Sequence, residues 1–292
     1  MQRLLDKLVI GTAQFGQDYG VTNENGQVSK EETLSIIKKA RFHNITSLDT
    51  ASAYGSSEYI LGNIGVDDLT IITKLPSIGS LEKGFTEFYK KSLECSLNNL
   101  KASSVNTILL HRPEELTGKY GKFIYEALYN LKVQGYTKNI GISIYSPDIL
   151  PSIIDNYELD SIQVPINIFD RRIIDSGWLK KLSDLNISII ARSIFLQGIL
   201  LSKCTDLPSY FNTWIPHFRA WNSFCVQNQL SPLEASLHFV AQIPEIDKII
   251  VGIESEVQFS EILEALDKPI DLNINHPGIN DINLISPINW QL

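Results

Sequence analysis

Eight short runs rich in Ile, Val and Leu recur along the 292-residue chain, and each is nearly continuous in apolar residues. Strands of this kind are typical of a sheet that is covered on both faces. The runs occupy residues 7–13, 45–51, 69–75, 105–112, 138–144, 161–167, 187–194 and 248–253. The chain is therefore limited to architectures that bury a sheet in the middle of the protein.

Longer stretches with helical spacing separate the runs. Residues 30–44 and 86–100 repeat apolar side chains every three to five positions, as the buried face of a helix requires. Ser29, and Ser231 followed by Pro232, stand where helices are expected to begin. Strand and helix candidates thus alternate along the chain.

Eight strands alternating with helices in a chain of this length predict the α/β class and a (β/α)8 TIM barrel, rather than an open doubly wound sheet. We find no linker or low-complexity segment, so we expect a single domain over residues 1–292. The main departure is the stretch 195–230, where aromatic residues and prolines fill a connection too long for a simple turn. Long ordered connections are often lids or binding loops.

Charge and cysteine content exclude several classes of function. The formal net charge is -8, and no Lys/Arg run is longer than a pair, which argues against a nucleic-acid or acidic-membrane partner. Three cysteines without CxxC spacing fit neither a disulfide framework nor a zinc site, so we expect no metal and a reducing compartment. Charges interrupt the apolar N-terminus, which matches neither a signal peptide nor a membrane span. We therefore expect a cytoplasmic protein that acts on small molecules.

Polar residues at the ends of three consecutive strands suggest a reaction site. Asp49 ends the second apolar run, Lys74 closes the third, His111 closes the fourth, and Tyr54 follows Asp49 on the next turn. In parallel barrels the chemistry gathers at the carboxyl ends of the strands. We therefore expect these four side chains to share one pocket.

Each of the four residues has a structural explanation when it is taken alone. Asp49 could cap a helix, Lys74 could pair with it, His111 could be a core histidine and Tyr54 could simply pack. Together they indicate chemistry, because an ammonium makes a nearby phenol a better acid and a carboxylate holds the ammonium in place. The set therefore predicts that Tyr54 is a proton donor and that Lys74 and Asp49 make its phenol a better acid.

Several motifs occur from residue 10 to the helix after the eighth strand: IGTAQFG, LDTASAYG, ITKLP, LLHRP, GISIYSP, QVPINIFDRR, ARSIFLQGIL and VGIESEVQFSEIL. Together they resemble the motifs of the aldo-keto reductases. The resemblance implies nicotinamide-dependent reduction of a carbonyl group to an alcohol, or its reverse, without a metal. It also implies that Tyr54 donates the proton, that Lys74 and Asp49 tune it, and that His111 orients the substrate.

The resemblance also implies contacts to the cofactor. Ser143 and Gln163 match positions that bind the nicotinamide carboxamide, although the usual Asn after Ser143 is Ile144 here. Arg192 stands where many relatives stack an aromatic ring on the nicotinamide, and a planar guanidinium can stack similarly; a plain surface arginine is the alternative. The remaining implied contacts are Gly11 and Thr12 in the first motif, and Phe195, Gln197 and Gly198 along the pyrophosphate.

The segment after the eighth strand departs most from the family pattern. Where NADP-binding relatives have Lys and Arg, this chain has Gly252 and Gln258; Ser255 remains as a phosphate donor, and Glu261 matches an acidic position near the adenine. Charged contacts hold phosphate most strongly, so their loss predicts weaker discrimination for NADP. NADP(H) is the family's usual cofactor, and NAD(H) or the use of both stays open.

Two other functions fit part of the sequence. Lys74 could form a Schiff base, as in aldolase-like barrels, but that role leaves Asp49, Tyr54 and the cofactor motifs unused. A non-catalytic, nicotinamide-binding regulatory protein would fit the altered cofactor segment, but not the intact set of four residues.

The sequence does not identify the substrate. The aromatic side chains of residues 204–221, and Trp290, could stack on a sugar, cover an apolar aldehyde, or pack on the barrel rim. Residues 17–20 and the pair Arg171-Arg172 resemble a bacterial subgroup linked to sugar metabolism, which favours a sugar-derived carbonyl. The oligomeric state cannot be predicted.

Overall fold

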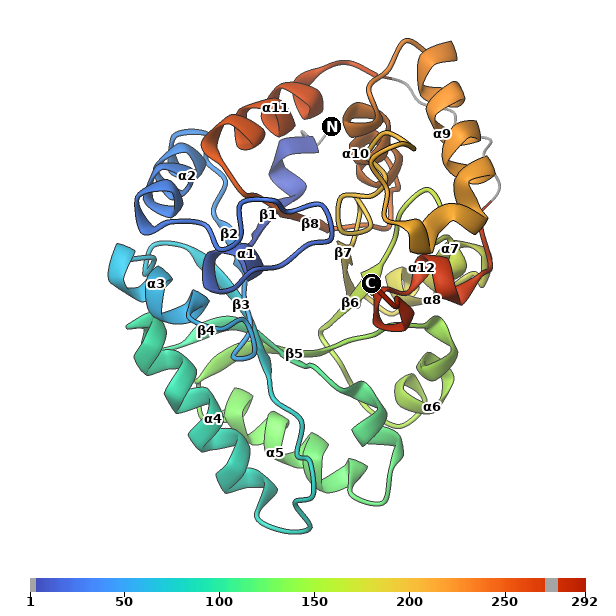
Figure 1. Cartoon of the computed structure of the whole chain (residues 1–292). Coiled ribbons are helices and arrows are strands. Elements are labelled where there is room, and N and C mark those ends of the chain that lie inside the picture. Colours follow the sequence, from blue (N-terminus) through green and yellow to red (C-terminus); the bar gives the residue numbers. More distant parts are fainter. Residues whose placement is uncertain (1–3, 271–277) are drawn as a thin grey trace.

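A closed barrel of parallel strands forms the centre of the computed structural model, which describes residues 4–270 and 278–292 (Figure 1). Each strand pairs with the next along the chain, and β8 pairs with β1. The strands are β1 (Leu8–Gly11), β2 (Ser47–Asp49), β3 (Thr70–Leu75), β4 (Val105–Leu110), β5 (Thr137–Ser143), β6 (Ser161–Pro165), β7 (Ser188–Arg192) and β8 (Lys248–Gly252). All eight predicted strands, and the (β/α)8 fold, are therefore confirmed.

Helices surround the barrel (Figure 1). The longer ones are α2 (Lys30–Phe42), α3 (Ser57–Ile64), α4 (Phe85–Leu100), α5 (Gly121–Val133), α8 (Trp178–Asp184), α9 (Ile215–Gln227), α10 (Pro232–Ala241) and α11 (Glu256–Asp267). Short helices are α1 (Ala13–Gly16), α6 (Leu150–Ile154), α7 (Arg172–Asp175) and α12 (Ile282–Ile285), and 3-10 helices are η1 (Leu4–Lys7), η2 (Pro113–Thr117), η3 (Pro147–Ile149), η4 (Ser209–Trp214) and η5 (Pro287–Asn289). No helix of the described residues is long and apolar enough to cross a membrane.

Both predicted helix starts are confirmed. The hydroxyl of Ser29 accepts a hydrogen bond from the backbone N–H of Glu32 at 3.1 Å. Ser231 accepts one from the N–H of Glu234 while the Glu234 carboxylate accepts from the Ser231 N–H, with Pro232 in the first turn. Such reciprocal caps satisfy backbone donors that a helix end leaves free, and they fix where each helix begins.

Two sets of residues, two positions apart along the strands, lie one above the other in the barrel. The lower set is a separate apolar cluster made of Val9, Ile72, Leu109, Ile190 and Ile250. Two positions further along the same strands, or just past their ends, stand Gly11, Lys74, His111, Arg192 and Gly252. Side chains two apart on a strand point to the same face. The apolar cluster therefore forms the floor of the barrel directly below Lys74, His111 and Arg192.

The stretch 195–230 is partly helical, contrary to the expectation of a long loop. Residues 215–227 form α9, because Phe218, Trp221 and Cys225 recur every three or four positions and are buried together. Such spacing gives a helix one apolar face.

The aromatic residues of this region form a second core. Phe211, Trp214 and Trp290 pack in edge and tilted contacts, and the Trp214 indole N–H donates to Asp281 at 2.9 Å. The interpretation that these side chains pack against the barrel rim therefore agrees with the structure.

Two glycines fix the turn that carries Tyr54. Gly55 has a φ of +55°, which favours glycine. A Cβ on Gly16 would lie 1.8 Å from the carbonyl oxygen of Tyr54, so α1 packs backbone to backbone on this turn. The N–H of Ser56 donates to the Gly16 carbonyl at 3.1 Å. The position of Tyr54 therefore depends on the missing side chain at Gly16.

We predict that Gly16→Ala destabilises the fold by about 1–3 kcal/mol, since the added methyl group has no room. Gly118→Ala is the control, because its φ is −87° and the nearest atom to an added Cβ is 3.6 Å away. Denaturant unfolding of both variants measures the difference. Equal stability of the two would contradict this view of the turn.

Candidate functional site

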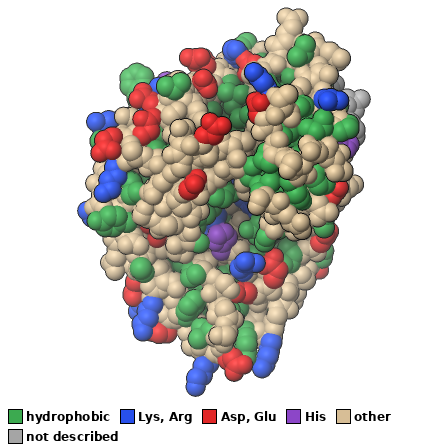
Figure 2. Space-filling view, in the orientation of Figure 1, with side chains coloured by type: hydrophobic (Ala, Val, Ile, Leu, Met, Phe, Trp, Pro, Cys, Tyr) green, Lys and Arg blue, Asp and Glu red, His purple; other side chains and the backbone are tan. Residues whose placement is uncertain are grey.

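A cavity of about 710 Å³ opens at the carboxyl ends of the strands, where Figure 2 shows the molecule hollowed at its centre. All of the predicted site residues except one line it. They are Gly11, Thr12, Asp49, Tyr54, Lys74, His111, Ser143, Gln163, Arg192, Phe195, Gln197, Gly198, Gly252, Gln258 and Glu261. The exception, Ser255, caps α11 by accepting the N–H of Gln258 at 3.1 Å.

A buried ion pair lies at the base of the cavity. The ammonium of Lys74 donates to Asp49 Oδ2 at 2.5 Å and to the backbone carbonyl of Thr50 at 3.1 Å. Its Nζ also lies 4.9 Å from the centre of the Tyr54 ring. Burial alone would lower the pKa of Lys74, but Asp49 and Tyr54 outweigh it and raise this pKa above its usual value. Lys74 is therefore held as a cation.

A chain of hydrogen bonds continues from this ion pair across the barrel. The amide N–H of Gln163 donates to the other oxygen of Asp49 at 2.7 Å, and the hydroxyl of Ser143 donates to Gln163 Oε1 at 3.2 Å. All three side chains are buried. The residues predicted for catalysis and those predicted to bind the nicotinamide therefore form one network.

His111 faces Tyr54 on the other side of the cavity. The two rings are 6.3 Å apart and nearly perpendicular, at 84°. Burial, followed by the charges of Lys74, Arg192 and Arg112, lowers the pKa of His111 from 6.5 to about 4. The imidazole is therefore neutral near pH 7, with one ring N–H able to donate to a ligand oxygen.

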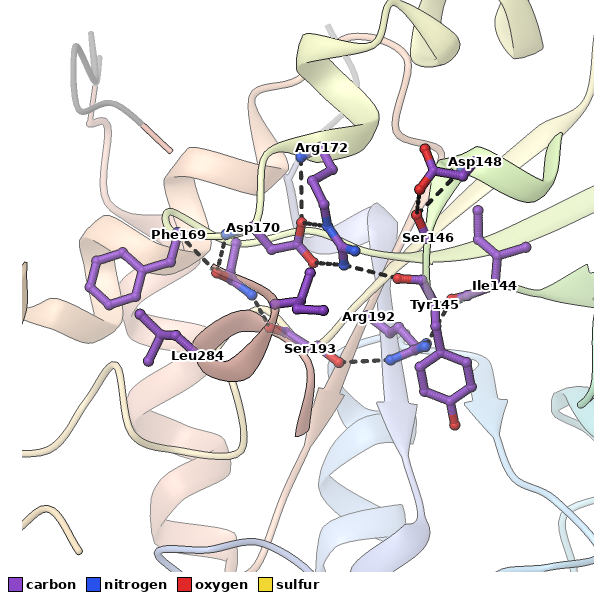
Figure 3. Close-up of polar contacts among 12 residues, drawn as sticks. Ile144, Tyr145, Ser146, Asp148, Phe169, Asp170, Arg172, Arg192, Ser193 and Leu284 are labelled. Atoms are coloured by element: carbon purple, nitrogen blue, oxygen red, sulfur yellow. Dashed lines mark hydrogen bonds and ion pairs between the residues drawn. The ribbon is translucent and has the colours of Figure 1, made fainter. Parts of the chain in front are cut away.

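Arg192 lies against a side chain that the sequence did not single out (Figure 3). Its guanidinium donates to the Ile144 carbonyl at 2.9 Å and to Ser193 Oγ at 3.0 Å. It also sits 4.8 Å from the centre of the Tyr145 ring. A planar guanidinium stacks on rings in this way, so Arg192 is fixed in the cavity wall and is not a plain surface arginine.

A second pair holds the loop that follows β5 (Figure 3). Asp170 binds Arg172 through both oxygens, at 2.8 and 2.7 Å, and Arg172 also donates to the carbonyl of Tyr145 at 2.9 Å. Asp170 is 1% exposed. The segment from Asp170 to the start of α7 therefore fixes the backbone of Tyr145, the residue on which Arg192 stacks.

The loops after β1 and β7 meet over the cavity. Gly198 has a φ of +90°, and a Cβ there would lie 1.9 Å from Thr22 Oγ1. The hydroxyl of Thr22 donates to the carbonyl of Gln197 at 3.3 Å. The packing of these two loops is therefore enough to require a glycine at this position.

Several cavity residues were missed in the sequence because they lie on loops or, in the case of Gln14, on the short helix α1, rather than at strand ends. They are Gln14, Gln17, Tyr19, Thr22, Tyr145, Ser193 and Glu254. Tyr145 and Glu254 each stand two positions after a predicted site residue, Ser143 and Gly252, which is the one signal that could have found them. Within residues 4–270 and 278–292, no cluster of His, Cys, Asp or Glu could hold a metal ion.

The Aldo/keto reductase family model matches residues 7–273. The chain belongs to the aldo/keto reductase family. The match covers nearly all of the chain and agrees with the closed barrel and with the strand-end motifs. The resemblance stated from the sequence is thereby confirmed, and the chain is an oxidoreductase of this family.

Two curated relatives match most of the chain. An uncharacterized oxidoreductase YqkF of Bacillus subtilis is 26% identical over 256 residues, which cover 81% of this chain and 82% of the relative. An L-galactose dehydrogenase of Arabidopsis thaliana is 24% identical over 281 residues, covering 89% and 86%.

Among solved structures, aldo-keto reductase AKR11C1 of Bacillus halodurans, in its holo form, superposes with a TM-score of 0.70. It is 18% identical, and the match covers 91% of this chain and 88% of that structure. At this identity the match supports the fold alone.

We predict that the His111 imidazole titrates near pH 4, well below an ordinary histidine. Between pH 6.5 and about 4 the unfolded chain binds a proton that the folded chain does not, so the free energy of unfolding falls as the pH falls. NMR titration, with the resonance identified by its loss in His111→Asn, measures this directly. Titration of His111 near pH 6.5 would contradict it.

Proposed function

We propose that this aldo/keto reductase reduces an aldehyde or ketone to an alcohol, or runs the reverse reaction, with Tyr54 as the general acid and base. A bound reduced nicotinamide dinucleotide would supply the hydride to the carbonyl carbon. The observation that carries the proposal is the buried Asp49–Lys74 pair beneath the Tyr54 ring. Residues of the chain carry out the proton transfer and hold the substrate.

In this proposal Tyr54 transfers its phenolic proton to the carbonyl oxygen as the carbon receives the hydride. The resulting phenolate lies beside the Lys74 ammonium, whose attraction stabilises the negative charge. Asp49 and the carbonyl of Thr50 hold two of the ammonium protons, so the cation cannot turn away from Tyr54. Water would then return a proton to the phenolate.

His111 is proposed to hold the carbonyl oxygen. Its pKa of about 4 keeps the ring neutral, so it can donate a hydrogen bond without competing with Tyr54 as an acid. Ser143 and Gln163 are proposed to hold the nicotinamide carboxamide on the opposite wall. The amide of Gln163 is already oriented by Asp49 at 2.7 Å.

The same geometry disfavours a Schiff-base aldolase. A lysine attacks a carbonyl only as the neutral amine, whereas the pKa of Lys74 is raised and its ammonium is bound to Asp49. A lysine held in this way stabilises charge rather than forming a covalent bond to the substrate.

We further propose a sugar-derived carbonyl compound as substrate. One relative carries the name L-galactose dehydrogenase. Tyr19, Tyr145 and Gln17 line the cavity, and such side chains offer hydrogen bonds together with ring faces on which sugars stack. A panel of aldoses and simple aldehydes, assayed with both reduced cofactors, tests the class of substrate.

We predict that Tyr54→Phe lowers kcat for the reduction of an activated aldehyde by about 10²–10⁴-fold, the usual contribution of a general acid. Binding of the reduced cofactor should change little, because the phenol acts on the substrate. Tyr145→Phe is the matched control, since it removes another phenol from the same cavity. Unchanged turnover in Tyr54→Phe would exclude Tyr54 as the proton donor, and cofactor binding without turnover in the wild type would favour a regulatory protein.

We also predict that borohydride added during turnover leaves Lys74 unmodified, because the ammonium does not form an imine. Intact-protein and peptide mass spectrometry measure the adduct. A reduced adduct on Lys74 would support the aldolase alternative.

A further inference from the structure

The cavity spans the barrel mouth between two regions of different charge. Tyr54, Lys74 and His111 lie at the ends of β2 to β4, whereas Gly252 to Ile262 come from β8 and the start of α11, on another part of the barrel (Figure 1). If the proposed function is right, the nicotinamide lies beside Tyr54. The family resemblance then implies that the adenosine half of the dinucleotide lies in the part of the cavity next to β8 and α11.

This second region is acidic. Among the described residues that line the cavity, the cations are Lys74 and Arg192, and β8 and α11 contribute neither Lys nor Arg. They and the turn between them contribute Glu254 and Glu261 instead. Red acidic side chains lie along the upper-left margin of the hollow in Figure 2. Lys39 is bound to the first turn of α11, but its ammonium is paired with Glu256 at 3.1 Å and Lys39 does not line the cavity. A dianionic phosphate in this part of the cavity would therefore face two carboxylates and no unpaired Lys or Arg of β8 or α11.

The start of α11 is also closed to a phosphate. Helix N-termini bind anions through free backbone N–H groups, but two of the first three in α11 already have partners. The N–H of Glu256 donates to Glu32 Oε1 at 2.5 Å, and that of Gln258 donates to the Ser255 hydroxyl. Glu254, directly before this cap, brings a carboxylate of its own to the helix end. The Glu32 carboxylate and the Ser255 hydroxyl thus already occupy two of the N–H groups that an external anion would need.

Glu254 is held in one orientation. Gln258 donates its amide N–H to Glu254 Oε2 at 3.3 Å and accepts the Glu254 backbone N–H at 3.0 Å. The other oxygen, Oε1, faces Gly20 on the loop after β1, where an added Cβ would be 3.9 Å away. One carboxylate oxygen is therefore turned toward the loop that covers the cavity, where it can accept a hydroxyl proton.

We propose that Glu254 is the residue that selects NAD(H) over NADP(H) in this chain. Its carboxylate accepts hydrogen bonds from the ribose hydroxyls of NAD(H), as acidic side chains do in other dinucleotide sites. The same carboxylate, together with Glu32 and Glu261, repels the 2′-phosphate of NADP(H). NADP(H) is the family's usual cofactor and the sequence left NAD(H) open, so the proposal favours one of the two cofactors that the sequence allowed.

The test measures dissociation constants of NADH and NADPH by fluorescence titration of the full chain. Wild type should bind NADH about tenfold more tightly or better, which corresponds to about 1.4 kcal/mol. Glu254→Gln should bring the ratio of the two constants at least threefold closer to one, mainly by tightening NADPH. Added salt should also reduce the wild-type ratio, because it screens repulsion between charges.

Glu264→Gln is the matched control, because Glu264 is an exposed glutamate of α11 that does not line the cavity. It should leave the ratio unchanged. Tighter binding of NADPH by wild type, or the same ratio in Glu254→Gln as in wild type, would overturn the proposal. Binding constants do not depend on turnover, so a protein that prefers NADH but reduces no carbonyl would refute the proposed function and leave this inference standing. Failure to bind either dinucleotide would refute both.

Discussion

The ion pair between Asp49 and Lys74 is the interaction on which the rest of the site depends. Burying an ammonium away from water costs free energy unless a carboxylate and further hydrogen bonds compensate its charge. Here Lys74 is 1% exposed and Asp49 3%. Both Asp49 oxygens are engaged, one by Lys74 and one by Gln163. Loss of either partner would leave a buried charge uncompensated, so these strand ends are locked in a single arrangement.

The barrel makes that arrangement possible through the alternation of side chains along a strand. Ile72 and Leu109 belong to the apolar floor, and Lys74 and His111 stand directly above them, two positions later. Because of this register, the Lys74 ammonium has apolar side chains below it and the cavity above it. Burial on one side shifts the pKa values of these groups, while the cavity on the other side admits a substrate.

This alternation explains how much the sequence could predict. Asp49, Lys74 and His111 were predicted because they end apolar runs, and a strand end determines both the place and the direction of its side chain. Loop residues have no such register. Glu254 turns toward Gly20, and Tyr145 lies under the guanidinium of Arg192, because loops meet segments that are far apart from them in the sequence. Residues 215–227 became a helix for a similar reason, since their aromatic face packs on the C-terminal segment.

Carboxylates at the two regions of the cavity show how environment decides the role of one chemical group. Asp49 is buried and paired with Lys74, so the Lys74 ammonium compensates its negative charge. The Glu254 carboxylate accepts a hydrogen bond from the Gln258 side-chain amide, and among the described residues no Lys or Arg forms an ion pair with it. An unpaired carboxylate acts at a distance on whatever enters the cavity. Asp49 therefore holds the strand ends in place, whereas Glu254 is the residue that we propose discriminates between NAD(H) and NADP(H).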